Sequence, residues 1–203
     1  MAQYSSASTI LGFRPYRSAR GQPTIQYFQE STCVSSQLIR RGHVVSFDTV
    51  VASASHRIVV APSSGGTGAN LLGTTNVLGV ALENSTSDGS TTGLGTAGRM
   101  IGVALAEQGT EFVGYLRGDL PAVSSMVGLT RAIIWDSTRN LFNLDSTNST
   151  AALAVCVVTG ILRLGSDGAG GAVESTVGDT NGPVLFRFLS TQTAPLVGRG
   201  SAG

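Results

Sequence analysis

The chain contains short apolar runs separated by glycine-rich polar turns, and this pattern limits its possible folds more than any other feature. Residues 78–82 (LGVAL) and 101–105 (IGVAL) form two near-identical pentads, and the loop between them consists almost wholly of Ser, Thr, Gly, Asn and Asp. A third run, residues 109–117, follows at once. Short runs of β-forming residues between Gly-rich breaks predict strands of a β-meander. The pentads are therefore expected to be core strands, and residues 83–98 an exposed connection.

Composition supports the same class of fold. Glycine accounts for 27 of 203 residues, and charged residues make up 12% of the chain, about half the share that is usual in soluble proteins. With 41% hydrophobic residues, the chain has enough apolar side chains to bury a core. We expect an all-β protein, with a small β-barrel or β-sandwich body, an extended N-terminal arm and little helix.

Further strands are predicted at residues 44–51, 58–61 and 183–189, and a long apolar run at 153–164 is broken by Gly160. Residues 131–136 and 141–145 predict a hairpin, because two apolar runs flank four polar residues. The residues expected in the core are Val44, Phe47, Val50, Val80, Leu82, Ile101, Val103, Phe112, Val113, Leu116, Ile134, Trp135, Phe142, Val155, Val157, Ile161, Phe186 and Phe188.

Residues 1–36 differ from the rest, because no helical or strand period is sustained there and two prolines disfavour helix. We interpret them as an extended arm that becomes ordered on a partner, followed by a body at 37–190 and a tail at 191–203. Three arginines at three-residue spacing would line one edge of a polyproline-like arm. A flexible terminus with incidental arginines is the alternative. The candidate partner-binding residues are Phe13, Arg14, Tyr16, Arg17, Arg20, Tyr27 and Phe28.

Charge and targeting signals point to few kinds of partner. The net charge is +1, so no bulk field favours nucleic acid or a membrane surface. All 13 basic residues are arginine, which suits protein interfaces, although a biased genome composition explains this equally well. The longest apolar run, residues 151–158, is too short to span a bilayer, and the first residues lack the pattern of a signal peptide. Cys33 and Cys156 are expected to be buried, reduced thiols.

Several motifs are explained better by composition than by chemistry. Residues 93–98 match GxGxxG, but they follow a polar loop and not a strand, which argues against nucleotide binding. The RGD tripeptide at 117–119 is best explained as a strand end and turn. The glycosylation sequons at Asn84 and Asn148 indicate exposed loops.

No set of residues predicts catalysis or a metal site. His43 and His56 have no second ligand at metal-binding spacing, and neither GxSxG nor HExxH occurs. Glu107 and Glu111 are interpreted as a solvated pair. We therefore expect no catalytic, cofactor-binding or metal-binding residues, although a hydrolase site assembled from distant residues stays open at this point.

Several segments together resemble the head decoration, or cement, proteins of tailed bacteriophages. These segments are the N-terminal stretch from Gly12 to Tyr27, the step Arg41-Gly42-His43-Val44-Val45 into a barrel strand, the IGVAL strand, the hairpin that ends in residues 142–145, and the ending at residues 177–188. At the barrel step, His43 stands where that family usually has an acid.

The resemblance implies a structural protein without an active site or cofactor, made in the host cytoplasm and located on the capsid exterior. It would bind the major capsid protein, bridge neighbouring capsid subunits and associate with itself, with a trimer favoured. The alternative is a virion knob or fibre-type adhesion module whose Ser/Thr/Gly/Asn-rich loops bind host-surface glycans.

Overall fold

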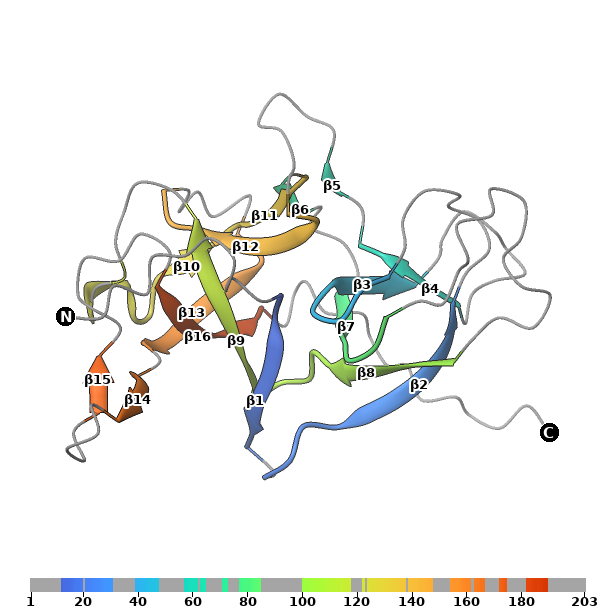
Figure 1. The fold of residues 1–203 in the computed structure, drawn as a ribbon, viewed down its shortest axis with the longest axis horizontal. Coiled ribbons are helices and arrows are strands. Elements are labelled where there is room, and N and C mark those ends of the chain that lie inside the picture. The colour runs from blue at the N-terminus through green and yellow to red at the C-terminus, as the bar shows by residue number, and fades with distance from the viewer. Residues whose placement is uncertain are drawn as a thin grey trace.

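The computed structural model describes residues 12–19, 21–30, 39–47, 57–61, 63–64, 71–72, 77–84, 100–117, 122, 124–137, 139–147, 154–161, 163–166, 172–174 and 182–189. In these residues the protein is all-β, as predicted, and helix is limited to one 3₁₀ turn at Ser124–Met126. The strands gather in two groups, with β1 (Arg14–Ser18) between them (Figure 1).

The first group is a closed barrel. Its order is β2-β4-β3-β7-β8, and every pair is antiparallel except β2 and β4. Its strands are β2 (Ile25–Glu30), β3 (Val44–Phe47), β4 (Arg57–Val60), β7 (Val77–Ala81) and β8 (Met100–Leu105). Phe28 and Phe47 come from strands that are not neighbours, yet their ring centroids lie 5.7 Å apart, so they meet inside the barrel.

The second group forms another ring, which we call the second barrel. Its strands are β9 (Thr110–Arg117), β10 (Thr130–Arg131), β11 (Ile133–Asp136), β12 (Leu141–Asp145), β13 (Cys156–Ile161) and β16 (Pro183–Phe188). The order is β10-β13-β16-β9-β12-β11. Only Ala132 separates β10 from β11, so these two strands form one nearly continuous segment. The strand order begins at β10 and ends at β11, and it therefore closes into a ring.

Two short strand pairs, in addition to β1, lie outside the two rings. The pair β5 (Ser63–Ser64) and β6 (Leu71–Leu72) follows β4 along the chain but extends the second group, because Leu71 pairs with Ile134 of β11. The strands β14 (Arg163–Ser166) and β15 (Ala172–Glu174) pair with each other.

The two barrels repeat one topology in the same order along the chain. β2, β3, β4, β7 and β8 correspond to β9, β10–β11, β12, β13 and β16, and the parallel pair β2–β4 corresponds to the parallel pair β9–β12. The register is also the same. The matching pairs are Val44–Val80 with Thr130–Val157, Val45–Gly79 with Arg131–Cys156, Gly79–Leu105 with Cys156–Phe188, Ala81–Val103 with Val158–Phe186, Tyr27–Gly102 with Val113–Leu185, Phe28–Ile101 with Gly114–Val184, Glu30–Ile58 with Leu116–Leu144, and Phe47–Ile58 with Ile133–Leu144.

The turns that enter β3 and β10 match as well. The N–H of Gly42 donates to the carbonyl of Ala81 at 2.8 Å, and that of Gly128 donates to the carbonyl of Val158 at 2.8 Å. Both glycines have positive φ, 91° and 87°, a region in which glycine carries no steric cost. The chain is thus built from two units of the same design.

Predicted strands are found at both pentads, at residues 110–117, in the 131–145 hairpin and at 183–188. The expected continuous meander is wrong after the second pentad. β8 pairs with β7 and β2, whereas β9 pairs with β16, β1 and β12. The turn at residues 106–109 therefore carries the chain from the first barrel to the second.

The separate N-terminal arm is also corrected for the residues that the structure describes. β1 and β2 are extended, but β1 pairs with β9 of the second barrel and β2 is a member of the first. We call residues 12–19 and 21–30 the strap, because β1 runs antiparallel to β9 and β2 runs antiparallel to β8, the two strands that flank the 106–109 turn. The boundary predicted at residue 36 therefore does not separate an arm from the body. Residues 1–11, 31–36 and 191–203 lie outside the described part.

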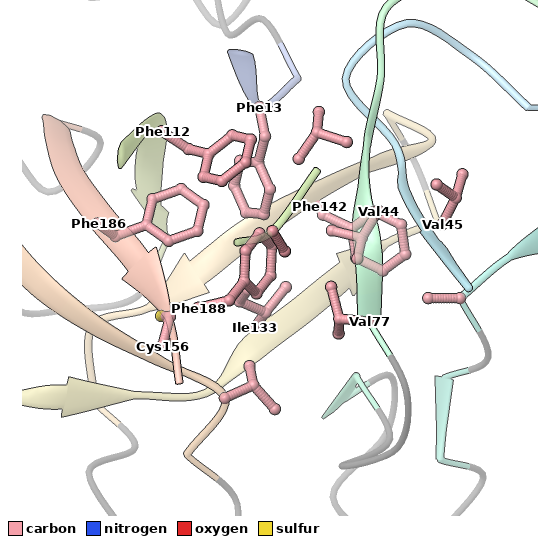
Figure 2. Close-up of a cluster of buried hydrophobic side chains, with 14 of the residues drawn as sticks. Phe13, Val44, Val45, Val77, Phe112, Ile133, Phe142, Cys156, Phe186 and Phe188 are labelled. Carbon is pink, nitrogen blue, oxygen red and sulfur yellow. The ribbon is translucent and has the colours of Figure 1, made fainter. Parts of the chain in front are cut away.

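Most of the predicted core is buried in one cluster that spans both barrels. Figure 2 shows Phe13, Phe112 and Phe186 on one side of this cluster, Val44, Val45 and Val77 on the other, and Phe142 between them. Phe47, Leu82, Ile134, Trp135, Val157 and Ile161 are only partly buried, and Val50 lies outside the described residues.

Candidate interaction surface

The strap holds the candidate binding residues, and the structure divides them into two sets. Phe13 and Phe28 are 2% and 7% exposed, so they are core residues and their prediction as partner contacts is corrected. Arg14, Tyr16, Arg17 and Tyr27 are exposed. Arg20 lies outside the described residues.

Phe13 is buried because the second barrel leaves space for its ring. A Cβ atom on Gly114 of β9 would lie 2.8 Å from Phe13 Cε1, 2.8 Å from Phe186 Cε1 and 2.4 Å from Leu144 Cδ1. The ring centroids of Phe13 and Phe186 are 4.8 Å apart. A side chain at residue 114 and the Phe13 ring cannot both fit without movement, so the strap supplies a core residue that β9 itself lacks.

Polar contacts fix the rest of the strap. Arg17 pairs with Glu111 at 2.5 Å, and the hydroxyl of Thr24 donates to Glu107 at 2.7 Å. Glu107 and Glu111 therefore bind the strap separately, which corrects their interpretation as a solvated pair. The Arg17 guanidinium also lies 5.6 Å from the centroid of the exposed Tyr16 ring, within the range of a cation–π contact.

The outward face of β2 and β8 carries three exposed apolar side chains. Ile25, Tyr27 and Met100 are 50%, 60% and 50% exposed. They share one face of the sheet. Tyr27 pairs with Gly102, Ile25 lies two residues before Tyr27 on β2, and Met100 lies two residues before Gly102 on β8. Side chains two residues apart on a strand point to the same face. If residue 102 carried a Cβ atom, that atom would lie 3.4 Å from Cε1 of the Tyr27 ring. Sequence reasoning missed Ile25 and Met100, because their proximity to Tyr27 depends on the β2–β8 register.

His43 lies buried where the two barrels meet. Its Nδ1 accepts a hydrogen bond from the Arg40 N–H at 3.1 Å, so Nε2 carries the proton and donates to the Asn140 carbonyl at 2.8 Å. Its ring meets Trp135 and Phe142 edge to face. Burial lowers the pKa of His43 from 6.5 to about 4. With both nitrogens engaged and the ring neutral, His43 serves as a structural link between the barrels.

Other groups that the sequence singled out also have structural partners. Arg117 of the RGD tripeptide pairs with the buried Asp136 at 3.1 Å, and Gly118 and Asp119 lie outside the described residues. Cys156 is buried and free, and burial raises the pKa of its thiol, which makes it a poor nucleophile. Asn84 is exposed and its side-chain oxygen accepts from the Arg41 N–H. Cys33, His56, Asn148 and residues 93–98 lie outside the described residues.

Neither a cluster of metal ligands nor a membrane-spanning helix is present in the described part of the chain. There, no group of three or more His, Cys, Asp or Glu residues could hold a metal ion. No helix among those same residues is long and apolar enough to cross a membrane.

Comparisons with known protein families, with characterised proteins and with solved structures found no match for this chain. The arrangement itself is that of an all-β protein with two equivalent barrels joined by a strap. Its exposed surface combines tyrosine, arginine and aliphatic side chains, and aromatic residues, methionine and arginine are enriched in protein interfaces.

Proposed function

We propose that the protein is a structural virion component that binds the outer surface of a phage capsid and stabilises it by bridging major capsid subunits. The observation that carries the proposal is the exposed face of the strap, with Tyr16, Arg17, Ile25 and Tyr27 on a charge-poor β body. Two of the segments that resemble decoration proteins also support the proposal by their position. Val44 begins one barrel strand, and residues 101–105 lie in another.

Bridging a lattice is favoured by a surface that is already ordered before it binds. The strap provides such a surface because it is fixed at both ends, by Phe13 in the second barrel and by β2 in the first. Preorganised side chains lose little conformational entropy on binding. Self-association as a trimer, which is part of the proposal, would multiply such contacts on one capsid.

The test is co-sedimentation with intact virions from the source of this chain, at a fixed ratio to the major capsid protein. Deleting the strap is unsuitable, because that would remove a barrel strand and a core phenylalanine. Single exposed residues are suitable instead. We expect Tyr16→Asp and Tyr27→Asp each to reduce occupancy at least tenfold, whereas Leu129→Asp, at a comparably exposed position in the second barrel, leaves it unchanged.

Two outcomes would contradict the proposal. One is the absence of the wild-type protein from virions. The other is specific binding to host-surface glycans without binding to virions, which would favour the adhesion module. Light scattering on the purified protein measures the oligomeric state independently.

A further inference from the structure

The two barrels differ at one strand position. In the second barrel, the last residues of β9 pair with β12, and the earlier residues, Thr110 to Val113, pair on that same edge with β1. In the first barrel, the last residues of β2 pair with β4. The earlier residues, Thr24 to Tyr27, have no strand on that edge among the residues described. We call this edge the open slot.

Backbone geometry shows that the open slot presents hydrogen-bonding groups. The Thr24 carbonyl accepts from the N–H of Leu105 of β8 at 2.9 Å. Because backbone groups alternate in direction along a strand, the N–H and C=O groups of Ile25 and Tyr27 point away from β8, into the slot. The side chains of Ile25, Gln26 and Tyr27 are all exposed, so this half-strand is open on both faces as well as on one edge.

The core of the first barrel is filled without a strand in this position. Phe28 corresponds in register to Gly114. In the second barrel, Gly114 has no side chain and Phe13 of the added strand fills the space; in the first barrel, Phe28 fills it from β2 itself. The added strand therefore completes a core in one barrel and is dispensable for the core of the other.

We infer that the open slot accepts an extended segment of a different polypeptide, which pairs antiparallel with β2 as β1 pairs with β9. Unpaired edges bind partner chains in this way, with backbone bonds giving affinity and alternate side chains giving specificity. Glu111, which pairs with Arg17, corresponds to Ile25, and Val113 corresponds to Tyr27. The segment should thus carry apolar side chains, not arginines, opposite Ile25 and Tyr27.

The described strands of a second copy offer a poor match to the open slot. The copy's β1 is already paired with its own β9. The outer edge of β1 contains Pro15, which has no N–H, and a register shift between Pro15 and Arg17, and both features block regular pairing. Since no described strand of a second copy fits, the partner inferred is another protein. Its identity as a capsid subunit rests on the proposed function, but the existence of the open slot does not.

The first measurement needs no partner. Hydrogen exchange on the isolated protein should show rapid exchange for the amides of Ile25 and Tyr27. The corresponding amides of Glu111 and Val113, which face β1, should exchange at least a hundredfold more slowly. Equal protection of the two pairs would overturn the open slot.

The second measurement tests the occupant. The probe is an array of synthetic hexapeptides that alternate apolar residues with Ser or Thr. We expect binding that Tyr27→Pro weakens at least tenfold, because proline removes a slot-facing N–H, and that Tyr27→Phe and Leu129→Asp leave unchanged. Tyr27→Pro does not remove a bond to β8, and the exchange rates of the β7 and β8 amides will confirm that the barrel is intact.

The same variants on virions separate the two proposals. Virion binding that Tyr16→Asp weakens but Tyr27→Pro does not would overturn the strand slot as the capsid contact, and the proposed function would then stand on the strap face around Tyr16. The opposite outcome is a wild-type protein that does not bind virions but binds peptides in a way that depends on residue 27. It would overturn the proposed function and leave the strand slot standing. No binding to any peptide, or self-association that Tyr27→Pro abolishes, would overturn the occupant that we infer.

Discussion

At the scale of single residues, His43 shows how a polar group can join two apolar units. Its two ring nitrogens satisfy the Arg40 N–H on one side and the Asn140 carbonyl on the other. The imidazole is 1% exposed, so protonation would place an unpaired charge in the core and break the bond that Nδ1 accepts. The neutral form is therefore the form that holds the barrels together.

Stability should fall in mild acid because of this residue. The pKa of His43 is about 4 in the folded protein and about 6.5 when it is exposed, so the unfolded state binds the proton more readily. The stabilisation is complete well above pH 6.5 and is lost as the pH falls towards 4, by roughly 1.5 kcal/mol between pH 6.5 and 5. Denaturant unfolding across this range measures the loss. His43→Gln should be less stable at pH 7 but should lack this pH dependence, and an unchanged slope in that variant would refute the assignment.

At the scale of elements, the strands rich in β-branched residues could be predicted from the sequence, but the strap could not. β9 and β16 show apolar runs bounded by turns, whereas β2 is exposed on both faces along half its length and so shows no period. β1 is held by Phe13, which inserts beside Gly114, a contact between residues far apart in sequence. Local patterns carry no signal for such a contact.

The two matched turns give a prediction at this scale. Gly42 and Gly128 share positive φ and the same hydrogen bond to the neighbouring strand. A Cβ on Gly128 would meet nothing within 4 Å, whereas a Cβ on Gly42 would lie 2.6 Å from the Cα of Gly12. Gly128→Ala should therefore cost only the backbone strain, about 1–2 kcal/mol.

Gly42→Ala should lower the free energy of unfolding clearly more than Gly128→Ala does, because the added Cβ also pushes the start of the strap away from the first barrel. Denaturant unfolding of the two variants measures the difference. Equal losses would mean that the close approach of Gly12 and Gly42 does not contribute to stability.

At the scale of the whole molecule, the repeated topology was hidden in the sequence because corresponding residues differ in chemistry. Phe28 corresponds to Gly114, and His43 corresponds to Leu129, so no recurring motif marks the two units. The two pentads do not mark the units either. Residues 78–82 and 101–105 belong almost wholly to adjacent strands of the first barrel. Backbone register, which one sequence does not display, is what the two units share.

The clearest consequence of two equivalent barrels is that equivalent core residues should stabilise different parts of the molecule. Phe13 packs against Phe186 in the second barrel, and Phe28 packs against Phe47 in the first. Truncation of either to alanine should cost about 3–5 kcal/mol. The loss should appear as faster hydrogen exchange mainly in β9 and β16 for Phe13→Ala, and mainly in β3 and β8 for Phe28→Ala. One apolar cluster spans both barrels, so some loss in the other barrel is expected, but at least tenfold smaller in exchange rate. If both variants accelerate exchange equally in all these strands, the two barrels unfold as a single unit. The barrels would then share a topology but would not differ in local stability.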